Sequence, residues 1–150
     1  MSVGNPSAPA PSSGTAADLM TPNPRTCSPF STVLEAVLIF RDADCGAVPV
    51  VDAGQPVGIL TDRDVALALA DHPDLASRPV SDIMTKGVLT IAPPAPLEEV
   101  RAKFGEHGVR RLLVAEPGGP LLGIIAWADL GPHATDAGIG QVVSEIVEKP

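Results

Sequence analysis

Residues 58–64 read GILTDRD, and residues 123–129 read GIIAWAD, so one short sequence recurs in the chain. The glycine, the two aliphatic residues and the final aspartate are kept, whereas Thr61 is replaced by Ala126. Two copies of one segment predict that the same local fold is built twice. The loss of a hydroxyl in one copy predicts that the two folds differ in chemistry.

The repeat extends over most of the chain. ADLMTP at 17–22 matches SDIMTK at 81–86 at an offset of 64 residues, and GAVPVVD at 46–52 matches RRLLVAE at 110–116 at the same offset. The offset becomes 65 only after the glycine-rich turn that follows, for GIL against GII. Because hairpin turns tolerate an inserted residue well, this pattern favours a duplication over chance.

Each copy predicts the element order β-α-β-β-α, after a short helical turn that ends in Met-Thr. In the first copy, the expected elements are a strand at 25–28, a helix from 33, strands at 47–51 and 57–61, and a helix at 62–70. In the second copy, they are a strand at 88–91, a helix behind Pro96, strands at 111–115 and 121–126, and a weaker helix after 127.

The first long helix of each copy carries start signals. Ser31 or Thr32 suits the N-cap, and Thr32 with Glu35 fits a capping box. Pro96 suits the first turn of the equivalent helix. Apolar residues lie on nearly all sides of 33–40, which predicts a buried helix.

The sequence predicts a mixed α/β (α+β) chain with domains at 17–72 and 79–134. Residues 1–16 are almost all Pro, Ser, Ala and Gly, which predicts a disordered leader. Residues 135–150 form a C-terminal tail, in which IGQVVSEIVEK at 139–149 predicts an amphipathic helix.

Composition excludes several classes of protein. A net charge of −8 argues against general nucleic-acid binding, which needs a basic face. No signal peptide and no apolar run long enough to cross a bilayer is visible, so we expect a cytoplasmic protein without a membrane partner. The histidines are too far apart for a metal site. Cys27 and Cys45 are interpreted as free thiols, with a redox pair as the alternative.

The GILTDRD turn allows two interpretations. Thr61 followed three residues later by Asp64 is close to a capping box, which needs no ligand. The same residues also suit nucleotide binding, because a carboxylate can accept hydrogen bonds from both hydroxyls of a ribose diol. Backbone N–H groups at the start of the following helix favour anions.

These segments together resemble a tandem pair of CBS (cystathionine-beta-synthase) domains, also called a Bateman module, of the stand-alone bacterial kind. The resemblance rests on Met20-Thr21, Met84-Thr85, the GAVPVVD and GVRRLLV blocks, and the two closing turns, and it covers 17–132. It implies two β-α-β-β-α motifs related by a pseudo-twofold axis, with their sheets packed together and helices outside. It further implies a homodimer and an adenosine ligand, which is AMP, ADP or ATP and in some members S-adenosylmethionine.

The resemblance also implies site residues. In the first copy, the ribose signature is matched by Gly58, Ile59, Thr61 and Asp64, with Ile59 against the adenine. The opposite wall is expected from the other unit, at Val88, Leu89, Arg110 and Arg111. Adjacent arginines suit a phosphate, because guanidinium offers bidentate donors. The alternative for these arginines is a surface salt bridge to Glu106 or Glu116.

The second copy implies a degenerate site. Its residues are Arg25, Gly46, Ile124 and Asp129, and Ala126 supplies no hydroxyl. Arg25 compensates in part for the missing arginine pair. Trp127 either fills core, which we favour, or shields an apolar cavity. We therefore expect one competent nucleotide site and one that has lost its hydroxyl.

The chain is interpreted as a regulatory module and not as an enzyme, because no activated nucleophile, acid/base pair or metal cluster is visible. It needs no obligatory cofactor. Binding of an adenosine nucleotide would change its packing or its interaction with a regulated protein that the sequence does not identify. The arginine pair favours a phosphate over S-adenosylmethionine. The alternative is a purely structural dimerisation or interaction module without a physiological nucleotide. An enzyme regulated in cis would need a catalytic domain, for which 150 residues leave no room.

Overall fold

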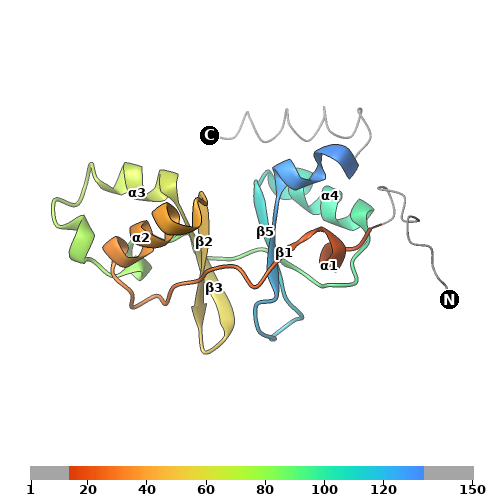
Figure 1. Cartoon of the computed structure of the whole chain (residues 1–150), viewed down its shortest axis with the longest axis horizontal. Coiled ribbons are helices and arrows are strands. Elements are labelled where there is room, and N and C mark those ends of the chain that lie inside the picture. The colour runs from red at the N-terminus through yellow and green to blue at the C-terminus, as the bar shows by residue number, and fades with distance from the viewer. Residues whose placement is uncertain (1–13, 134–150) are drawn as a thin grey trace. The chain divides into compact units, whose positions relative to one another are not determined.

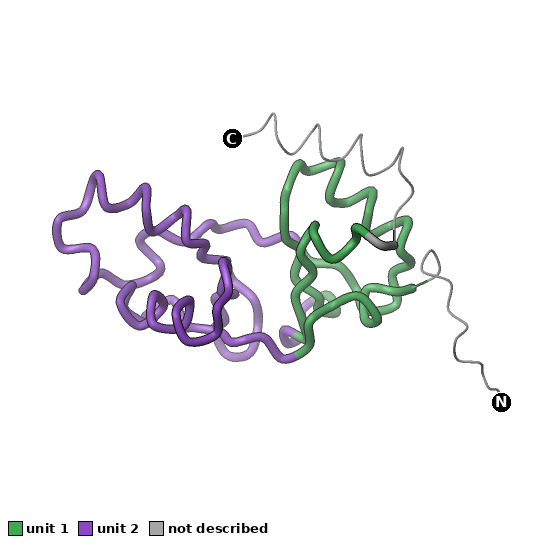
Figure 2. The backbone as a smooth tube through the Cα atoms, turned by 45° about the horizontal axis from the view of Figure 1, so that its top comes forward, with its two compact units in different colours: residues 1–22, 90–117, 122–150 green, residues 23–89, 118–121 purple. Residues whose placement is uncertain are grey.

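The computed structural model describes residues 14–133, which form two compact units (Figures 1 and 2). Unit 1 combines the chain up to Pro22 with Thr90–Pro117 and the chain from Leu122 onward. Unit 2 contains Asn23–Leu89 and Gly118–Leu121. The units are therefore not the two sequence repeats. The Met-Thr opening of each repeat belongs to the unit that the other repeat builds.

Unit 1 contains a four-stranded sheet in the order β1-β6-β5-β4. Its strands are β1 (Thr21–Pro22), β6 (Gly123–Ala126), β5 (Arg111–Val114) and β4 (Thr90–Ile91). Strands β5 and β6 form an antiparallel hairpin, in which Arg111 pairs with Ala126. Strand β1 joins β6 antiparallel and β4 joins β5 parallel. The hairpin is thus extended on both edges by short segments from distant parts of the chain.

Unit 2 repeats this arrangement around the hairpin of β2 (Ala47–Asp52) and β3 (Gln55–Thr61). An isolated antiparallel bridge joins Thr85 to Ile59 of β3, in the place that β1 takes beside β6. A parallel bridge joins Cys27 to Val50 of β2, as β4 joins β5. The predicted strand at 25–28 is therefore reduced to a single bridge.

Helices lie to one side of each hairpin (Figure 1). In unit 2 these are α2 (Val33–Ala43) and α3 (Asp62–Ala68). The predicted capping box of α2 is confirmed, since Thr32 N donates to Glu35 Oε1 at 2.8 Å and Glu35 N donates to Thr32 Oγ1 at 3.1 Å. The side chains of Val48, Val50 and Leu60 are fully buried beneath these helices and form the centre of the core with Ala36.

Unit 1 has the helices α1 (Ala16–Leu19) and α4 (Leu97–His107) and the 3-10 helix η5 (Trp127–His133). Phe104 of α4 is fully buried, and its ring meets the Trp127 ring edge-on at 6.0 Å between centroids. This contact supports the core interpretation of Trp127. Pro96 occupies the N-cap position of α4, one residue before the predicted first turn.

The 3-10 helix η3 (Leu75–Ser77) joins the repeats, and the 3-10 helix η4 (Val80–Asp82) begins the second one. This segment is fixed to the start of α2, because Val33 N donates to Arg78 O at 2.8 Å and Val80 N donates to Ser31 O at 2.7 Å. Arg78 also forms ion pairs with Asp74 and Asp82, at 2.9 and 3.0 Å. The hydrogen bonds that Arg78 donates to Asp74 and Asp82 raise the pKa of Arg78, and the bond that Asp74 accepts from Arg78 lowers the pKa of Asp74.

The structure corrects two expectations, on where the leader ends and on how far α2 is buried. Thr15 and Ala16 belong to the folded unit and not to the leader, because Thr15 caps α1 and Ala16 is fully buried. Helix α2 is not buried on all sides, since Leu34 and Leu38 are 50% and 38% exposed. Residues 1–13 of the predicted leader and the predicted helix at 139–149 lie outside the described residues. The pseudo-twofold relation between the units stays a prediction.

Candidate functional site

Thr61 and Asp64 form two reciprocal hydrogen bonds at the junction of β3 and α3. Thr61 N donates to Asp64 Oδ2 at 2.9 Å, and Asp64 N donates to Thr61 Oγ1 at 3.1 Å. The capping-box interpretation of the sequence is therefore confirmed. The cap also fixes the carboxylate of Asp64, which is half-buried, so it is compatible with a binding role.

Thr85 adds a second hydroxyl to this cluster. Its Oγ1 donates to Asp64 Oδ2 at 3.4 Å. Its backbone is paired with β3, because Ile59 N donates to Thr85 O at 3.0 Å and Thr85 N donates to Ile59 O at 2.9 Å. Thr85 is not among the site residues predicted from the sequence. The available signal was the repeated Met-Thr pair, which recurs at nearly the same offset as the GIL and GII turns.

Gly58 is required by the approach of the Met84-Thr85 segment. A Cβ atom at Gly58 would lie 2.7 Å from Met84 Sδ and 2.9 Å from the Thr85 carbonyl oxygen. Gly123 of unit 1 stands in the same relation, because a Cβ there would lie 2.9 Å from the Thr21 carbonyl oxygen. The glycine of each closing turn and the Met-Thr pair of the opposite repeat are therefore one packing unit.

The matching turn of unit 1 keeps only half of the cap. Ala126 N donates to Asp129 Oδ2 at 3.0 Å, but Ala126 has no hydroxyl to return the bond. The following helix is the 3-10 helix η5 in place of an α-helix. Within residues 14–133, no further hydrogen bond to the Asp129 carboxylate is present, so this group is less constrained than Asp64.

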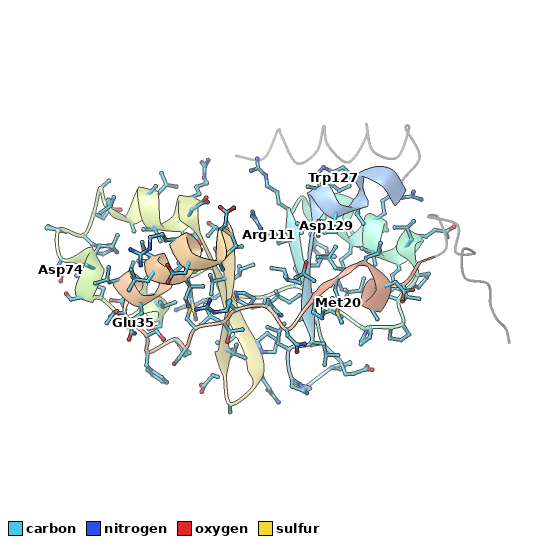
Figure 3. All side chains as sticks on the ribbon, in the orientation of Figure 1. Met20, Glu35, Asp74, Arg111, Trp127 and Asp129 are labelled. Atoms are coloured by element: carbon cyan, nitrogen blue, oxygen red, sulfur yellow. The ribbon has the colours of Figure 1, made fainter. Side chains whose placement is uncertain are left out.

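The remaining predicted residues are divided between the units. Val88 and Leu89, both half-buried, lie in unit 2 with Asp64, although the resemblance placed them in the opposite unit. Arg25 and Gly46 also belong to unit 2. Arg110, Arg111, Ile124 and Asp129 belong to unit 1, where Figure 3 labels Arg111, Trp127 and Asp129. Any meeting of the arginines with Asp64 stays a prediction.

Neither Arg110 nor Arg111 forms an ion pair within the described residues. Arg110 is exposed and precedes β5, and its carbonyl oxygen accepts the Trp127 N–H at 2.7 Å. Arg111 is half-buried at the start of β5. The alternative salt bridge from these arginines to Glu106 or Glu116 is absent from the part of the chain that the structure describes. Glu106 Oε1 lies instead 3.8 Å from His107 Nε2.

Other chemistry is limited in the described residues. From residue 14 to residue 133, no group of three His, Cys, Asp or Glu side chains is placed to hold a metal ion. Cys27 and Cys45 are both free thiols, and burial, with a smaller contribution from Glu35, raises the pKa of Cys27 from 9.0 to about 11. No helix in this range is long and apolar enough to cross a membrane.

The chain thus contains two small α/β units. Each unit holds a Gly-x-x-x-x-x-Asp turn of one repeat, and the Met-Thr segment of the other repeat pairs with the strand that leads into this turn. These features define a class of paired small domains. The chain belongs to the CBS domain family, which it matches at residues 16–71 and 80–130. The recognition of two CBS motifs from the sequence is thereby confirmed, as is the mixed α/β fold.

Relatives and solved structures agree with this assignment. The CBS domain-containing protein YhcV of Bacillus subtilis is 35% identical over 113 residues, which cover 75% of this chain and 80% of that protein. The CBS domain pair of protein MJ0100, solved with 5′-methylthioadenosine and S-adenosylmethionine, is 26% identical with a TM-score of 0.70, covering 79% of this chain and 93% of that one. CBSX2, solved with AMP, is 26% identical with a TM-score of 0.65, covering 90% and 97%.

Proposed function

We propose that the chain is a ligand-sensing module that binds an adenosine nucleotide at the Asp64 turn of unit 2. The observation that carries this proposal is the fixed carboxylate of Asp64, which accepts hydrogen bonds from Thr61 and Thr85. The adenosine ligands in the MJ0100 and CBSX2 structures support the ligand class. AMP, ADP and ATP are the proposed ligands, ahead of S-adenosylmethionine.

The proposed site uses the residues of the ribose signature. Asp64 accepts hydrogen bonds from the ribose, Ile59 lies against the adenine, and Gly58 keeps the Met84-Thr85 segment close to β3. Val88 and Leu89 are proposed as apolar contacts of the base. Arg110 and Arg111 are proposed to bind phosphate, because guanidinium groups form bidentate hydrogen bonds with it.

The second turn is proposed as a degenerate site. Asp129 lacks the hydroxyl partner that Thr61 gives to Asp64, and Ala126 offers no donor to a ribose or phosphate oxygen. Arg25, Gly46 and Ile124 are the other residues proposed there. We expect adenosine nucleotides to bind this site much more weakly.

The proposed consequence of binding is regulatory and not catalytic. A ligand that binds one arrangement of the two units better than another shifts the population toward it. A regulated protein then recognises the altered arrangement. The two free thiols fit a reducing compartment such as the cytoplasm.

A thermal-shift panel of AMP, ADP, ATP, NAD and S-adenosylmethionine on the purified chain tests the proposal. A ligand present at a hundredfold excess over its Kd stabilises the folded state by about 2.7 kcal/mol. The expected result is a raised melting temperature with at least one adenosine nucleotide. No shift with any of the five at millimolar concentration contradicts the proposed function.

A second candidate, dimerisation through unit 2, is favoured by one observation. Phe30, Leu34, Leu38, Leu67 and Leu69 are the large apolar side chains that are exposed in the described residues, and all lie in unit 2. At the matching positions of unit 1, Leu34 is replaced by Glu98 and Leu38 by Ala102. A second copy of the chain is the proposed occupant of this surface, and nucleotide sensing and dimerisation are compatible.

A further inference from the structure

The carboxylate of Asp64 has one engaged oxygen and one open oxygen. Oδ2 accepts the Thr61 N–H at 2.9 Å and the Thr85 hydroxyl at 3.4 Å. A carboxylate oxygen offers about two lone-pair sites, so these two donors occupy it. Between residues 14 and 133, no protein donor is hydrogen-bonded to Oδ1. Asp64 therefore presents a single open oxygen to a ligand.

A ribose diol brings two hydroxyl donors, and two neighbouring acceptor atoms can receive one each. Asp64 Oδ1 supplies one acceptor. The Thr85 hydroxyl directs its hydrogen to Asp64 Oδ2, which leaves the lone pairs of Oγ1 available, and the Thr85 side chain is exposed. Thr85 Oγ1 is thus the second acceptor beside the open carboxylate oxygen.

The position of Thr85 is fixed before any ligand arrives. Its N–H and carbonyl both pair with Ile59 of β3, at 2.9 and 3.0 Å. The preceding Met84 packs on Gly58, where no side chain fits. Since strand β3 also ends in Thr61, one strand positions both partners of Asp64. A group held in this way loses little conformational freedom when a ligand binds.

We propose that Asp64 Oδ1 and Thr85 Oγ1 together accept the two hydroxyls of the ribose, so that Thr85 sets the preference of this site for ribose over deoxyribose. The inference rests on the proposed function and names a residue outside the Thr-x-x-Asp turn. The two units differ at this position. Thr21 takes the same place beside β6, but within the described residues its hydroxyl makes no hydrogen bond to Asp129.

Titration calorimetry of the full chain with AMP, 2′-deoxy-AMP and 3′-deoxy-AMP tests this assignment. Thr85→Val removes the hydroxyl and keeps the shape of an exposed side chain. We expect this variant to bind AMP about threefold to tenfold more weakly, the range of one lost hydrogen bond. Its loss for one of the two deoxy-analogues should be much smaller, because that analogue lacks the hydroxyl that Thr85 accepts.

Three further variants complete the experiment. Thr85→Ser keeps the hydroxyl and should bind AMP as the wild type does. Thr85→Ala should reproduce the selectivity of Thr85→Val, so the result does not depend on one variant folding. Thr21→Val makes the matched change in unit 1 and should leave AMP binding unchanged.

The outcomes separate this inference from the proposed function. If the wild type binds AMP and Thr85→Val binds it equally well, or loses affinity equally for all three nucleotides, Thr85 is not a ribose acceptor while the proposed function stands. If the wild type binds none of the adenosine nucleotides, the proposed function fails and the assignment of Thr85 fails with it.

Discussion

Thr61 and Asp64 exchange two hydrogen bonds, from N–H to carboxylate at 2.9 Å and from N–H to hydroxyl at 3.1 Å, whereas Ala126 and Asp129 share one at 3.0 Å. The change from threonine to alanine therefore has a local structural effect before any ligand is considered. The α-helix α3 follows the complete cap, and the 3-10 helix η5 follows the incomplete one. This asymmetry makes the two turns a natural matched pair for experiment.

Removal and restoration of the cap should have opposite effects on stability. Thr61→Ala should lower the free energy of unfolding by about 1 kcal/mol, because Asp64 N–H loses its acceptor. Ala126→Thr should raise it by about 0.5–1 kcal/mol, because the threonine can accept the N–H of Asp129. Urea denaturation of both variants measures these changes. If Thr61→Ala and Ala126→Thr both lowered or both raised the free energy of unfolding, the prediction that the two positions are equivalent caps would be contradicted.

Gly58 should not tolerate a methyl group. Gly58→Ala places Cβ against Met84 Sδ and the Thr85 carbonyl oxygen, and overpacking of this kind costs about 1–3 kcal/mol. Gly131→Ala is the matched control, because a Cβ there meets nothing within 4 Å. Thermal unfolding should show a clear loss for the first variant and little change for the second. A Gly58→Ala variant as stable as the control would contradict the packing of Met84-Thr85 on β3.

Cys27 and Cys45 should differ in reactivity and in their effect on pH dependence. Cys27 is buried and its pKa is raised to about 11, so a thiol reagent at pH 8 should label Cys45 much faster. The folded state keeps the Cys27 proton to higher pH than the unfolded state does. The free energy of unfolding should therefore fall as pH rises from about 9 to about 11, and Cys27→Ala should weaken that slope. Equal labelling rates would show that Cys27 is accessible.

The apolar surface of unit 2 should mediate self-association. Leu38→Glu adds a charge to the exposed face of α2 and should convert a dimer to a monomer, as measured by analytical ultracentrifugation. Ala102→Glu makes the matched change on α4 and should leave the dimer intact. A wild-type chain that is monomeric at tens of micromolar, or dissociation by Ala102→Glu alone, would contradict this assignment of the surface.

Much of the fold could be predicted from the sequence because the signals were local or duplicated. The capping box at Thr32 and Glu35 and the β2–β3 hairpin are examples of local signals. The repeat then indicated where each element recurs. The exposure of Leu34 and Leu38 could not be predicted, because an apolar helix face covered by a partner and one covered by core look alike in a single sequence.

The exchange of the opening segments also could not be predicted from local pattern. Each Met-Thr pair packs on a glycine of the other repeat, at Gly58 and Gly123, and this long-range contact leaves no periodic signal. The same contact brings Thr85 to Asp64, which is why the sequence identified Thr61 and Asp64 but not their third partner. The apolar segments GAVPVVD and GILT indicated the two strands of a hairpin. They did not indicate which edge of a hairpin each Met-Thr segment joins.

The proposed nucleotide site is tested most directly by calorimetric titration of AMP into the wild type, Asp64→Ala and Asp129→Ala. Loss of the Asp64 carboxylate should weaken binding by about tenfold to a hundredfold, since it removes a charge-assisted hydrogen bond to the ribose. Asp129→Ala should bind AMP nearly as the wild type does. Equal losses in the two variants, or undiminished binding by Asp64→Ala, would contradict the assignment of the competent site to unit 2.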